Sequence, residues 1–199
     1  MKRILAAFLA AALVFTLCGC GGKKESAPKK QSAQKTETQN NSIYAEDYEE
    51  YIENMEKFFA GDVALYKTCF PIAYWDYILA GQQTTEKALF EKLEGEFKKF
   101  ETQLEETYGK NLQYQVKEIS KEKLSKKTLE KMGKALNSYC NIIKADLLTA
   151  GYTVTMESTV KGDKSAVTDK YECYIVKYDG LWYSVRYSEE ENIAFFREP

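Results

Sequence analysis

The spacing of the apolar residues changes at Gly151, and this change restricts the fold more than any other feature of the sequence. Before Gly151 apolar residues recur every three or four positions, the period of a helix lying on a surface. After it they alternate with polar residues, as in Tyr152, Val154 and Met156, the period of a half-buried strand. Helices followed by strands predict an α+β fold with helices packed on an antiparallel sheet.

Glycine and proline divide the first part of the chain into helices. Gly61 ends a predicted helix over 45–60, and Asp62 can cap a second one that reaches Cys69. Pro71 begins a third over 71–80, because proline is tolerated in a first helical turn. We therefore expect three short helices before residue 81.

Two longer helices follow. The first is capped by Thr84 or Thr85 and ends before Gly109, and its charged outer face indicates packing on one side only. The second is capped by Ser125 and is expected to stop at Gly151. Between them, residues 112–116 alternate and predict a half-buried strand.

The dipeptide Asp179-Gly180 is a strong signal for a two-residue hairpin turn. Such a turn places three apolar pairs on one face: Tyr178 and Leu181, Val176 and Tyr183, and Tyr174 and Val185. A second turn at Gly162-Asp163 would put Val154 on the opposite face. Either both faces are covered, or a bulge near Asp169 shifts the alternation, and we favour the bulge.

The opposite face carries Cys173, Ile175 and Trp182. We expect helices to cover one face of the sheet and leave the other open. The open face could bind a second copy of the chain, which makes a homodimer one expected partner, or it could be covered by the tail over 193–196.

The N-terminus has the pattern of a secretion signal. Lys2 and Arg3 precede an uncharged apolar run over 4–17, and this run of about 14 residues is shorter than the roughly 20 that span a bilayer. It ends at Leu17-Cys18-Gly19-Cys20, which resembles the lipobox of bacterial lipoproteins. The resemblance implies removal of residues 1–19, a diacylglyceryl group on Cys20 and anchoring at the extracytoplasmic face of the cell membrane. The alternatives are an ordinary secreted protein or an uncleaved anchor.

Composition separates a tether from a folded part. After Cys20, residues 21–42 contain no large apolar side chain, so 20–42 is expected to be a flexible tether. The 157 residues over 43–199 suit a single domain. Their 21 basic and 28 acidic residues do not resemble a nucleic-acid-binding surface.

The chain contains no histidine, which removes Ser-His-Asp and Cys-His catalysis and histidine-containing metal sites. We expect no metal and no cofactor. Three cysteines, Cys69, Cys140 and Cys173, follow the lipobox without metal-ligand spacing, and we expect them to be buried free thiols rather than a disulfide.

Two short motifs carry a family resemblance: Phe59-Ala60-Gly61-Asp62 after the first helix, and Tyr178-Asp179-Gly180-Leu181-Trp182-Tyr183 near the end. With the order of the elements, residues 43–190 resemble the nuclear-transport-factor-two-like, or cystatin-like, superfamily. The resemblance implies a curved antiparallel sheet that ends in a three-stranded meander and forms a cone. Members use the cone for catalysis, for binding or for dimer formation.

Asp76 is an acidic residue inside the apolar stretch 70–80. A carboxyl group held in apolar surroundings is a candidate general base or ligand contact. We name Asp76, Trp75, Tyr74 and Tyr114 as candidate ligand-binding residues and assign no catalytic residue. The alternative is that Asp76 points to solvent.

These features predict a membrane-anchored extracytoplasmic lipoprotein with a non-enzymatic domain that binds a small ligand or an envelope protein. One alternative is a pocket enzyme without histidine or metal, similar to an isomerase or dehydratase. Another is an accessory subunit of an envelope or transporter complex.

Overall fold

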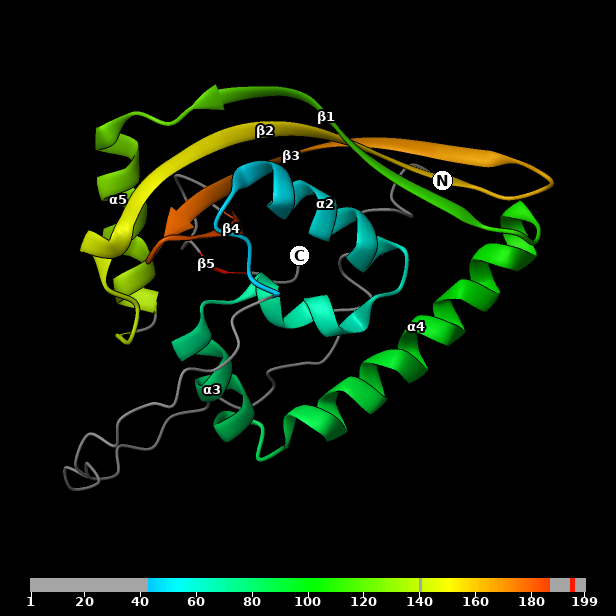
Figure 1. Ribbon diagram of the computed structural model, residues 1–199, viewed down its shortest axis with the longest axis horizontal. Helices are drawn as coiled ribbons and strands as arrows, with labels where there is room; N and C mark the ends of the chain where they lie inside the picture. Colours follow the sequence, from blue (N-terminus) through cyan, green and yellow to red (C-terminus); the bar gives the residue numbers. More distant parts are fainter. Residues whose placement is uncertain (1–42, 140, 187–193, 196–199) are drawn as a thin grey trace.

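A curved antiparallel sheet lies between helices (Figure 1). The computed structural model describes residues 43–139, 141–186 and 194–195. Its helical elements are α2 (Tyr48–Phe59), the 3-10 helix η1 (Val63–Cys69), α3 (Ile72–Gly81), α4 (Glu86–Tyr108), α5 (Lys126–Tyr139) and the 3-10 helix η2 (Ala145–Leu147). Its strands are β1 (Gln113–Lys123), β2 (Leu148–Lys161), β3 (Ala166–Tyr178), β4 (Leu181–Arg186) and β5 (Ala194–Phe195). The predicted α+β class is confirmed. The sheet is open, and the cone stays a prediction.

Side-chain caps and glycines define most helix ends, and the cap at Asp47 was not predicted. Asp47 accepts hydrogen bonds from the amides of Glu49 and Glu50 at the start of α2, and Gly61 beyond its end has a φ of 106°. Thr85 caps α4 by accepting from the Ala88 amide. Asp62 precedes η1, but within the described residues its side chain makes no capping hydrogen bond, and η1 is a 3-10 helix.

The helix predicted to run from Ser125 to Gly151 is shorter than expected. Ser125 does cap α5, but the helix ends at Tyr139, and β2 begins at Leu148. The connection turns back because Asn137 Nδ2 donates to the Ile143 carbonyl (2.7 Å) and the Lys144 amide donates to the Tyr178 hydroxyl (3.1 Å). Apolar residues after 139 therefore reach the core by folding back, and their helical spacing is misleading.

Gly151 lies inside β2 rather than at a helix end. A Cβ atom there would lie 2.9 Å from Leu124, 3.0 Å from Val176 and 3.2 Å from Leu129. Real Cβ atoms rarely make such close contacts, so the glycine permits α5 and its preceding loop to approach the sheet. Gly151 was interpreted as the end of a helix, but its role in the structure is to allow close packing between α5 and the sheet.

The five strands form one sheet in the order β1-β2-β3-β4-β5. The last turn has positive φ at both central residues, 49° at Asp179 and 84° at Gly180. All three predicted pairs across this turn are confirmed: Tyr178 with Leu181, Val176 with Tyr183, and Tyr174 with Val185. The tail returns as β5, in which Phe195 pairs with Val185, while residues 193 and 196 lie outside the described residues.

The bulge predicted near Asp169 is wrong. The register between β2 and β3 continues from Ala150 opposite Lys177 to Lys161 opposite Ala166, with Ser158 opposite Asp169. Irregularities occur elsewhere, between Glu118 and Ser120 in β1 and between Leu148 and Ala150 in β2. Since the alternation is unbroken across Asp169, the apolar sets of the two hairpins do lie on opposite faces, and both need cover.

Helices of the same chain cover both faces. The first face carries Tyr152 and Trp182, whose rings contact Tyr48 of α2 at centroid distances of 5.2 Å each. The opposite face carries Gly151 and Val176, against which α5 packs. The expectation that helices cover only one face is therefore wrong. A homodimer stays a prediction, without an uncovered sheet face to require it.

Two hydrophobic cores result. The sheet core joins α2, the second half of α4 and the first face of the sheet; its buried residues are Ala45, Tyr48, Tyr51, Phe59, Leu104, Tyr108, Val116, Val154, Met156, Val160, Ile175 and Trp182. The helix-rich core joins η1, α3, the first half of α4, α5 and the opposite face; it includes Cys69, Phe70, Tyr74, Trp75, Ile78, Leu89, Leu93, Met132, Leu136, Ile143, Val176 and Tyr183.

The segment before α2 lies along β4. The Trp182 amide donates to the Ala45 carbonyl at 3.0 Å, and Asn54 Nδ2 donates to the Ile43 carbonyl at 3.3 Å. The chain therefore enters the described structure bound to both α2 and the sheet.

At the other end of the sheet, the turn between β2 and β3 meets the end of α4 (Figure 1). Asp163 Oδ1 accepts from the Lys110 amide at 3.0 Å, and the Lys164 amide donates to the Tyr108 carbonyl at 2.9 Å. The predicted turn at Gly162-Asp163 is thus fixed by contacts outside the hairpin.

Candidate functional site

Helix α3 carries three of the four residues predicted to bind a ligand, two on its buried side and one on its exposed side. Trp75 is 1% exposed and Tyr74 is 4% exposed, so both belong to the helix-rich core. Asp76 points the other way and is exposed. Of the two interpretations of Asp76 from the sequence, this exposure agrees with a side chain that points to solvent and not with a carboxyl group held in apolar surroundings.

A carboxylate on α4 satisfies the buried indole of Trp75. Trp75 Nε1 donates to Glu86 Oε2 at 2.7 Å, and Lys67 Nζ of η1 lies 2.9 Å from the same oxygen. Desolvation alone would raise the pKa of Glu86, but the bonds from Lys67 and Trp75 outweigh it and hold that pKa below its usual value. Glu86 is thus a charged junction between η1, α3 and α4.

Tyr44 lies beside this junction. Its hydroxyl donates to the Lys67 carbonyl at 3.4 Å, and its ring meets Tyr183 edge to face with a centroid distance of 6.4 Å. Burial raises the pKa of Tyr44 above its usual value, and the carboxylates of Glu86 and Asp76 raise it further. The hydroxyl therefore stays protonated as a donor at neutral pH.

The outer side of α3 presents an aromatic ring to solvent. Tyr77 is 55% exposed and stacks on Tyr74 with a centroid distance of 5.9 Å and an interplanar angle of 20°. Asp76, Ala73 and Ala80 are exposed on the same helix. We call Ala73, Asp76, Tyr77 and Ala80 the α3 surface. A supported aromatic ring beside a carboxylate and two small side chains can contact a ligand at little entropic cost.

Tyr77 was not among the residues predicted to bind a ligand. Its helix is apolar on nearly every side, so periodicity gives no signal for which aromatic residue faces outward. The contacts of Trp75 with Glu86 and Phe90 of α4 fix which side of α3 faces inward.

Tyr114, the fourth candidate, lies elsewhere. It is on β1, packs at the edge of the sheet core and is paired with Val160. Burial raises its pKa to about 12, and the charges of Glu101 and Glu105 on α4 act in the same direction. The structure therefore brings Tyr74, Trp75 and Asp76 to one helix and leaves Tyr114 in the other core.

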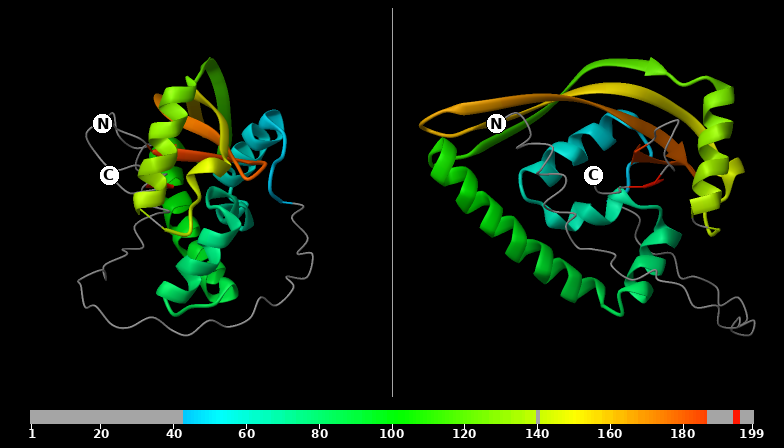
Figure 2. Two further views of the ribbon diagram at one scale, coloured as in Figure 1. Left: turned by 90° about the vertical axis from the view of Figure 1, so that its left-hand side faces the viewer. Right: turned by 180° about the vertical axis from the view of Figure 1, so that it is seen from behind.

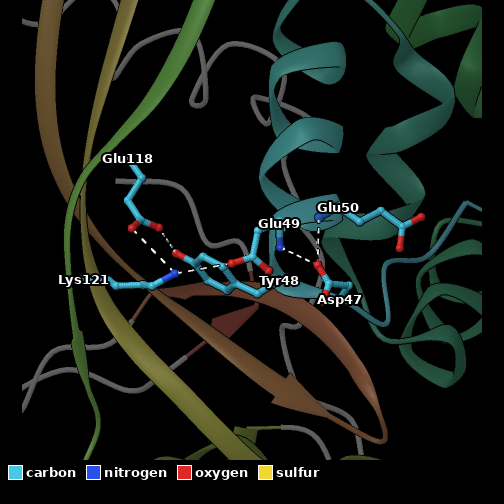
Figure 3. A network of polar contacts seen from close by, with 6 residues as sticks. All are labelled: Asp47, Tyr48, Glu49, Glu50, Glu118 and Lys121. Atoms are coloured by element: carbon cyan, nitrogen blue, oxygen red, sulfur yellow. Dashed lines mark hydrogen bonds and ion pairs between the residues drawn. The ribbon is translucent and has the colours of Figure 1, made fainter.

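A polar network at the start of α2 was not predicted (Figure 3). The Tyr48 hydroxyl donates to Glu118 Oε2 at 2.6 Å. Lys121 Nζ lies 4.0 Å from the centroid of the Tyr48 ring, 3.7 Å from Glu118 and 3.8 Å from Glu49. Burial, followed by the hydrogen bond and charge of Glu118, raises the pKa of Tyr48, so this group does not act as a base. The network fastens α2 to the irregular part of β1.

The two described thiols after the lipobox are free, as predicted. Cys69 is buried in the helix-rich core, and Cys173 is partly buried beside the sheet core. Burial raises the pKa of both thiols to about 12, which disfavours the nucleophilic thiolate. Cys140 lies outside the described residues, as do Cys18 and Cys20.

Among the residues that the structure describes, no three potential ligands from His, Cys, Asp and Glu come together as a metal site. Nor does any described helix have both the length and the apolar character needed to cross a bilayer. Comparison of the chain with protein-family models, with curated proteins and with solved structures gives no match.

Proposed function

We propose that this protein is an extracytoplasmic lipoprotein, anchored through a diacylglyceryl group on Cys20, whose α+β domain binds a ligand or envelope protein without catalysing a reaction. The observation that carries the proposal is Leu17-Cys18-Gly19-Cys20 directly after an uncharged apolar run. Two acyl chains give durable attachment, since each buried methylene contributes about 0.8 kcal/mol and one chain alone is marginal.

The polar tether supports the same proposal. Its 22 residues over 21–42 would have an end-to-end distance of roughly 25 Å as a flexible coil. That reach keeps the folded part close to the bilayer while leaving it free to turn. A tethered domain of this kind can present any of its surfaces to the membrane or to a neighbouring protein.

Binding is favoured over catalysis by the chemistry of the best candidate residues. Asp76 is exposed, and both described thiols and the tyrosines of the two polar clusters have pKa values raised by burial. Groups that stay protonated and neutral at pH 7 are poor bases and nucleophiles. The α3 surface, with its exposed Tyr77, is the part best suited to contact a ligand.

Labelling with a radioactive or clickable fatty acid tests the anchor. Cys20→Ala should abolish incorporation and leave a precursor of higher mass, whereas the matched control Cys18→Ala should incorporate label as the unchanged chain does. Both substitutions remove one thiol from the same motif, so only loss confined to Cys20→Ala supports the proposal. Label retained on Cys20→Ala would overturn it.

Binding at the α3 surface can be tested separately with Tyr77→Ala. A photoreactive residue placed at Ala73 should crosslink the bound molecule in cells, and Tyr77→Ala should reduce that crosslink without lowering the melting temperature. A crosslink unaffected by Tyr77→Ala would remove the α3 surface from the proposal and leave the anchor untouched.

A further inference from the structure

Helix α5 concentrates positive charge on a molecule that is otherwise acidic. Residues 43–199 carry 21 basic and 28 acidic residues. Against that excess of acid, the exposed side of α5 and the end of β1 present a group of lysines that we call the basic face: Lys123, Lys126, Lys127, Lys131 and Lys134. Glu122 and Glu130 are the acidic residues interspersed among them. The basic face is thus a local excess of positive charge.

The lysines of the basic face are not paired with carboxylates of the described residues. Over residues 43–139 and 141–186, no ion pair joins any member of the basic face to a carboxylate. By contrast, Lys121 on β1 contacts two glutamates, and Lys67 contacts Glu86. Within the described residues, no ion pair therefore neutralises the positive charge of the basic face.

The placement of two of the lysines also costs helix stability. Lys126 and Lys127 open α5, where the partial positive charge of the helix dipole disfavours cations, and its first turn contains no acidic residue. Helices α2 and α4 have the acidic first turn that the helix dipole favours: Glu49 and Glu50 in α2, and Glu86 in α4. Among the described helices, α5 is the one that opens on two lysines, and no ion pair within the described residues compensates for them, which favours a role for these lysines outside folding.

The basic face is also well placed to reach a surface. Helix α5 stands at one end of the sheet, opposite the turn between β2 and β3 (Figures 1 and 2). It covers one face of the sheet, while the acidic helix α2 covers the other. A negatively charged plane would attract the α5 side and repel the α2 side, which fixes the orientation of the molecule.

We propose that the basic face docks on anionic phospholipid headgroups of the bilayer that holds the lipid anchor. This inference rests on the proposed anchoring, because the tether of roughly 25 Å keeps α5 within reach of that bilayer. Each lysine near an anionic membrane surface contributes about a fivefold increase in the surface-bound population, and the attraction is screened within about 8 Å at physiological salt. Docking turns the α2 side away from the membrane.

Lysine footprinting of the full lipid-modified chain tests this inference. The chain is reconstituted into vesicles of phosphatidylcholine alone or with phosphatidylglycerol added, treated with an acetylating reagent, and analysed by mass spectrometry. Acetylation of the basic face should slow at least about fivefold on the anionic vesicles only, and high salt should restore it. The lysines of α4, Lys87, Lys92, Lys98 and Lys99, should react alike on both vesicles.

Two variants that each lose four positive charges distinguish docking through the basic face from electrostatic attraction of the whole molecule to the membrane. The first replaces Lys126, Lys127, Lys131 and Lys134 by glutamine; the second makes the same change at Lys87, Lys92, Lys98 and Lys99. Lys123 should lose its slowed acetylation in the α5 variant and keep it in the α4 variant. Circular dichroism confirms that both variants fold.

Several results would overturn the inference. Equal slowing on α5 and α4 means that the molecule has no fixed orientation, and no slowing on a chain whose mass includes the lipid refutes docking while the anchor stands. Slowing caused by soluble polyglycerol phosphate but not by phosphatidylglycerol would assign the basic face to a wall polymer instead. A purified chain whose mass lacks the lipid refutes the anchor, and this inference with it.

Discussion

The two hydrophobic cores are built on different frameworks. The sheet core packs on β1, β2 and β3, whose backbone hydrogen bonds fix the side-chain positions of Val116, Val154 and Ile175. The helix-rich core collects side chains from four helical elements and the other face of the sheet, and Glu86 is the carboxylate that joins three of those helices. One core is therefore positioned by strand register and the other by side-chain contacts, so they should respond differently to substitution.

Thiol reactivity should show the largest effect, because each core has one described cysteine. With a pKa of about 12, only on the order of one molecule in ten thousand carries the thiolate at pH 8. In a Cys140→Ser background, iodoacetamide should modify the folded chain on the order of a thousandfold more slowly than the chain in denaturant. Cys173 should react before Cys69, because it is the more exposed of the two. Fast modification of Cys69 would contradict its burial.

Leu136→Ala should be the most destabilising of the substitutions considered. Leu136 is 0% exposed in the helix-rich core, and removing a buried leucine side chain typically costs about 2–5 kcal/mol. Urea unfolding measures the loss. Hydrogen exchange should show α5 and α3 deprotected more than the centre of β2 and β3, and uniform deprotection would argue against two separately supported cores.

Glu86→Gln should destabilise the helix-rich core by about 1 kcal/mol, since the bonds to Trp75 and Lys67 lose their charge and Glu86 is partly exposed. The effect depends on pH. Because the folded pKa of Glu86 is lowered, its stabilisation is complete above the unfolded value of about 4.3 and is lost as pH falls through the folded value. Urea titrations at pH 7 and pH 3 should therefore show the difference between the two proteins shrinking at pH 3.

Tyr48→Phe should lower stability by roughly 0.5–1.5 kcal/mol, because it removes the hydrogen bond to Glu118 and keeps the ring contacts with Tyr152 and Trp182. Thermal unfolding measures the loss, and Tyr77→Phe on the exposed α3 surface is the matched control. Equal losses in the two variants would show that the network of Figure 3 does not stabilise α2.

Asp76→Asn should change the free energy of unfolding least, by no more than about 0.5 kcal/mol, because the exposed Asp76 side chain makes few contacts that the substitution could remove. Differential scanning calorimetry is sensitive enough to detect a larger change. A clear gain in stability would mean that the carboxylate is held at a cost, and would return Asp76 to consideration as a functional acid.

The two cores also differ in how well sequence predicts them. Pairs such as Val176 with Tyr183 follow from Asp179-Gly180, because a two-residue turn fixes the register of its strands. The helix-rich core depends on where α5 ends, and the helical spacing continues past Tyr139 although the chain turns back. Hydrogen bonds from distant residues, such as the one between Lys144 and Tyr178, decide that turn, and no local pattern reports them.

The candidate site shows the same limit. Asp76 could be recognised as unusual among apolar neighbours, but its direction depends on which side of α3 faces α4. The indole of Trp75 donates its hydrogen bond to Glu86, which in the sequence looks like an ordinary acidic residue in the first turn of the next helix. Burial and hydrogen-bond partners across three elements are properties of the packed structure, and single-sequence periodicity does not contain them.

The hydrogen bonds at the entry of the chain have a mechanical consequence. A pull on the residues before Ile43 would load the bonds from Trp182 to Ala45 and from Asn54 to Ile43 before it loads any strand pair. Tyr44, whose ring packs on Tyr183 in the helix-rich core, would be drawn out as well, and helix α2, whose Tyr48 contacts Tyr152 and Trp182, would follow. Tension applied at the N-terminal side therefore reaches both cores through neighbouring residues, Tyr44 in the helix-rich core and Ala45 in the sheet core.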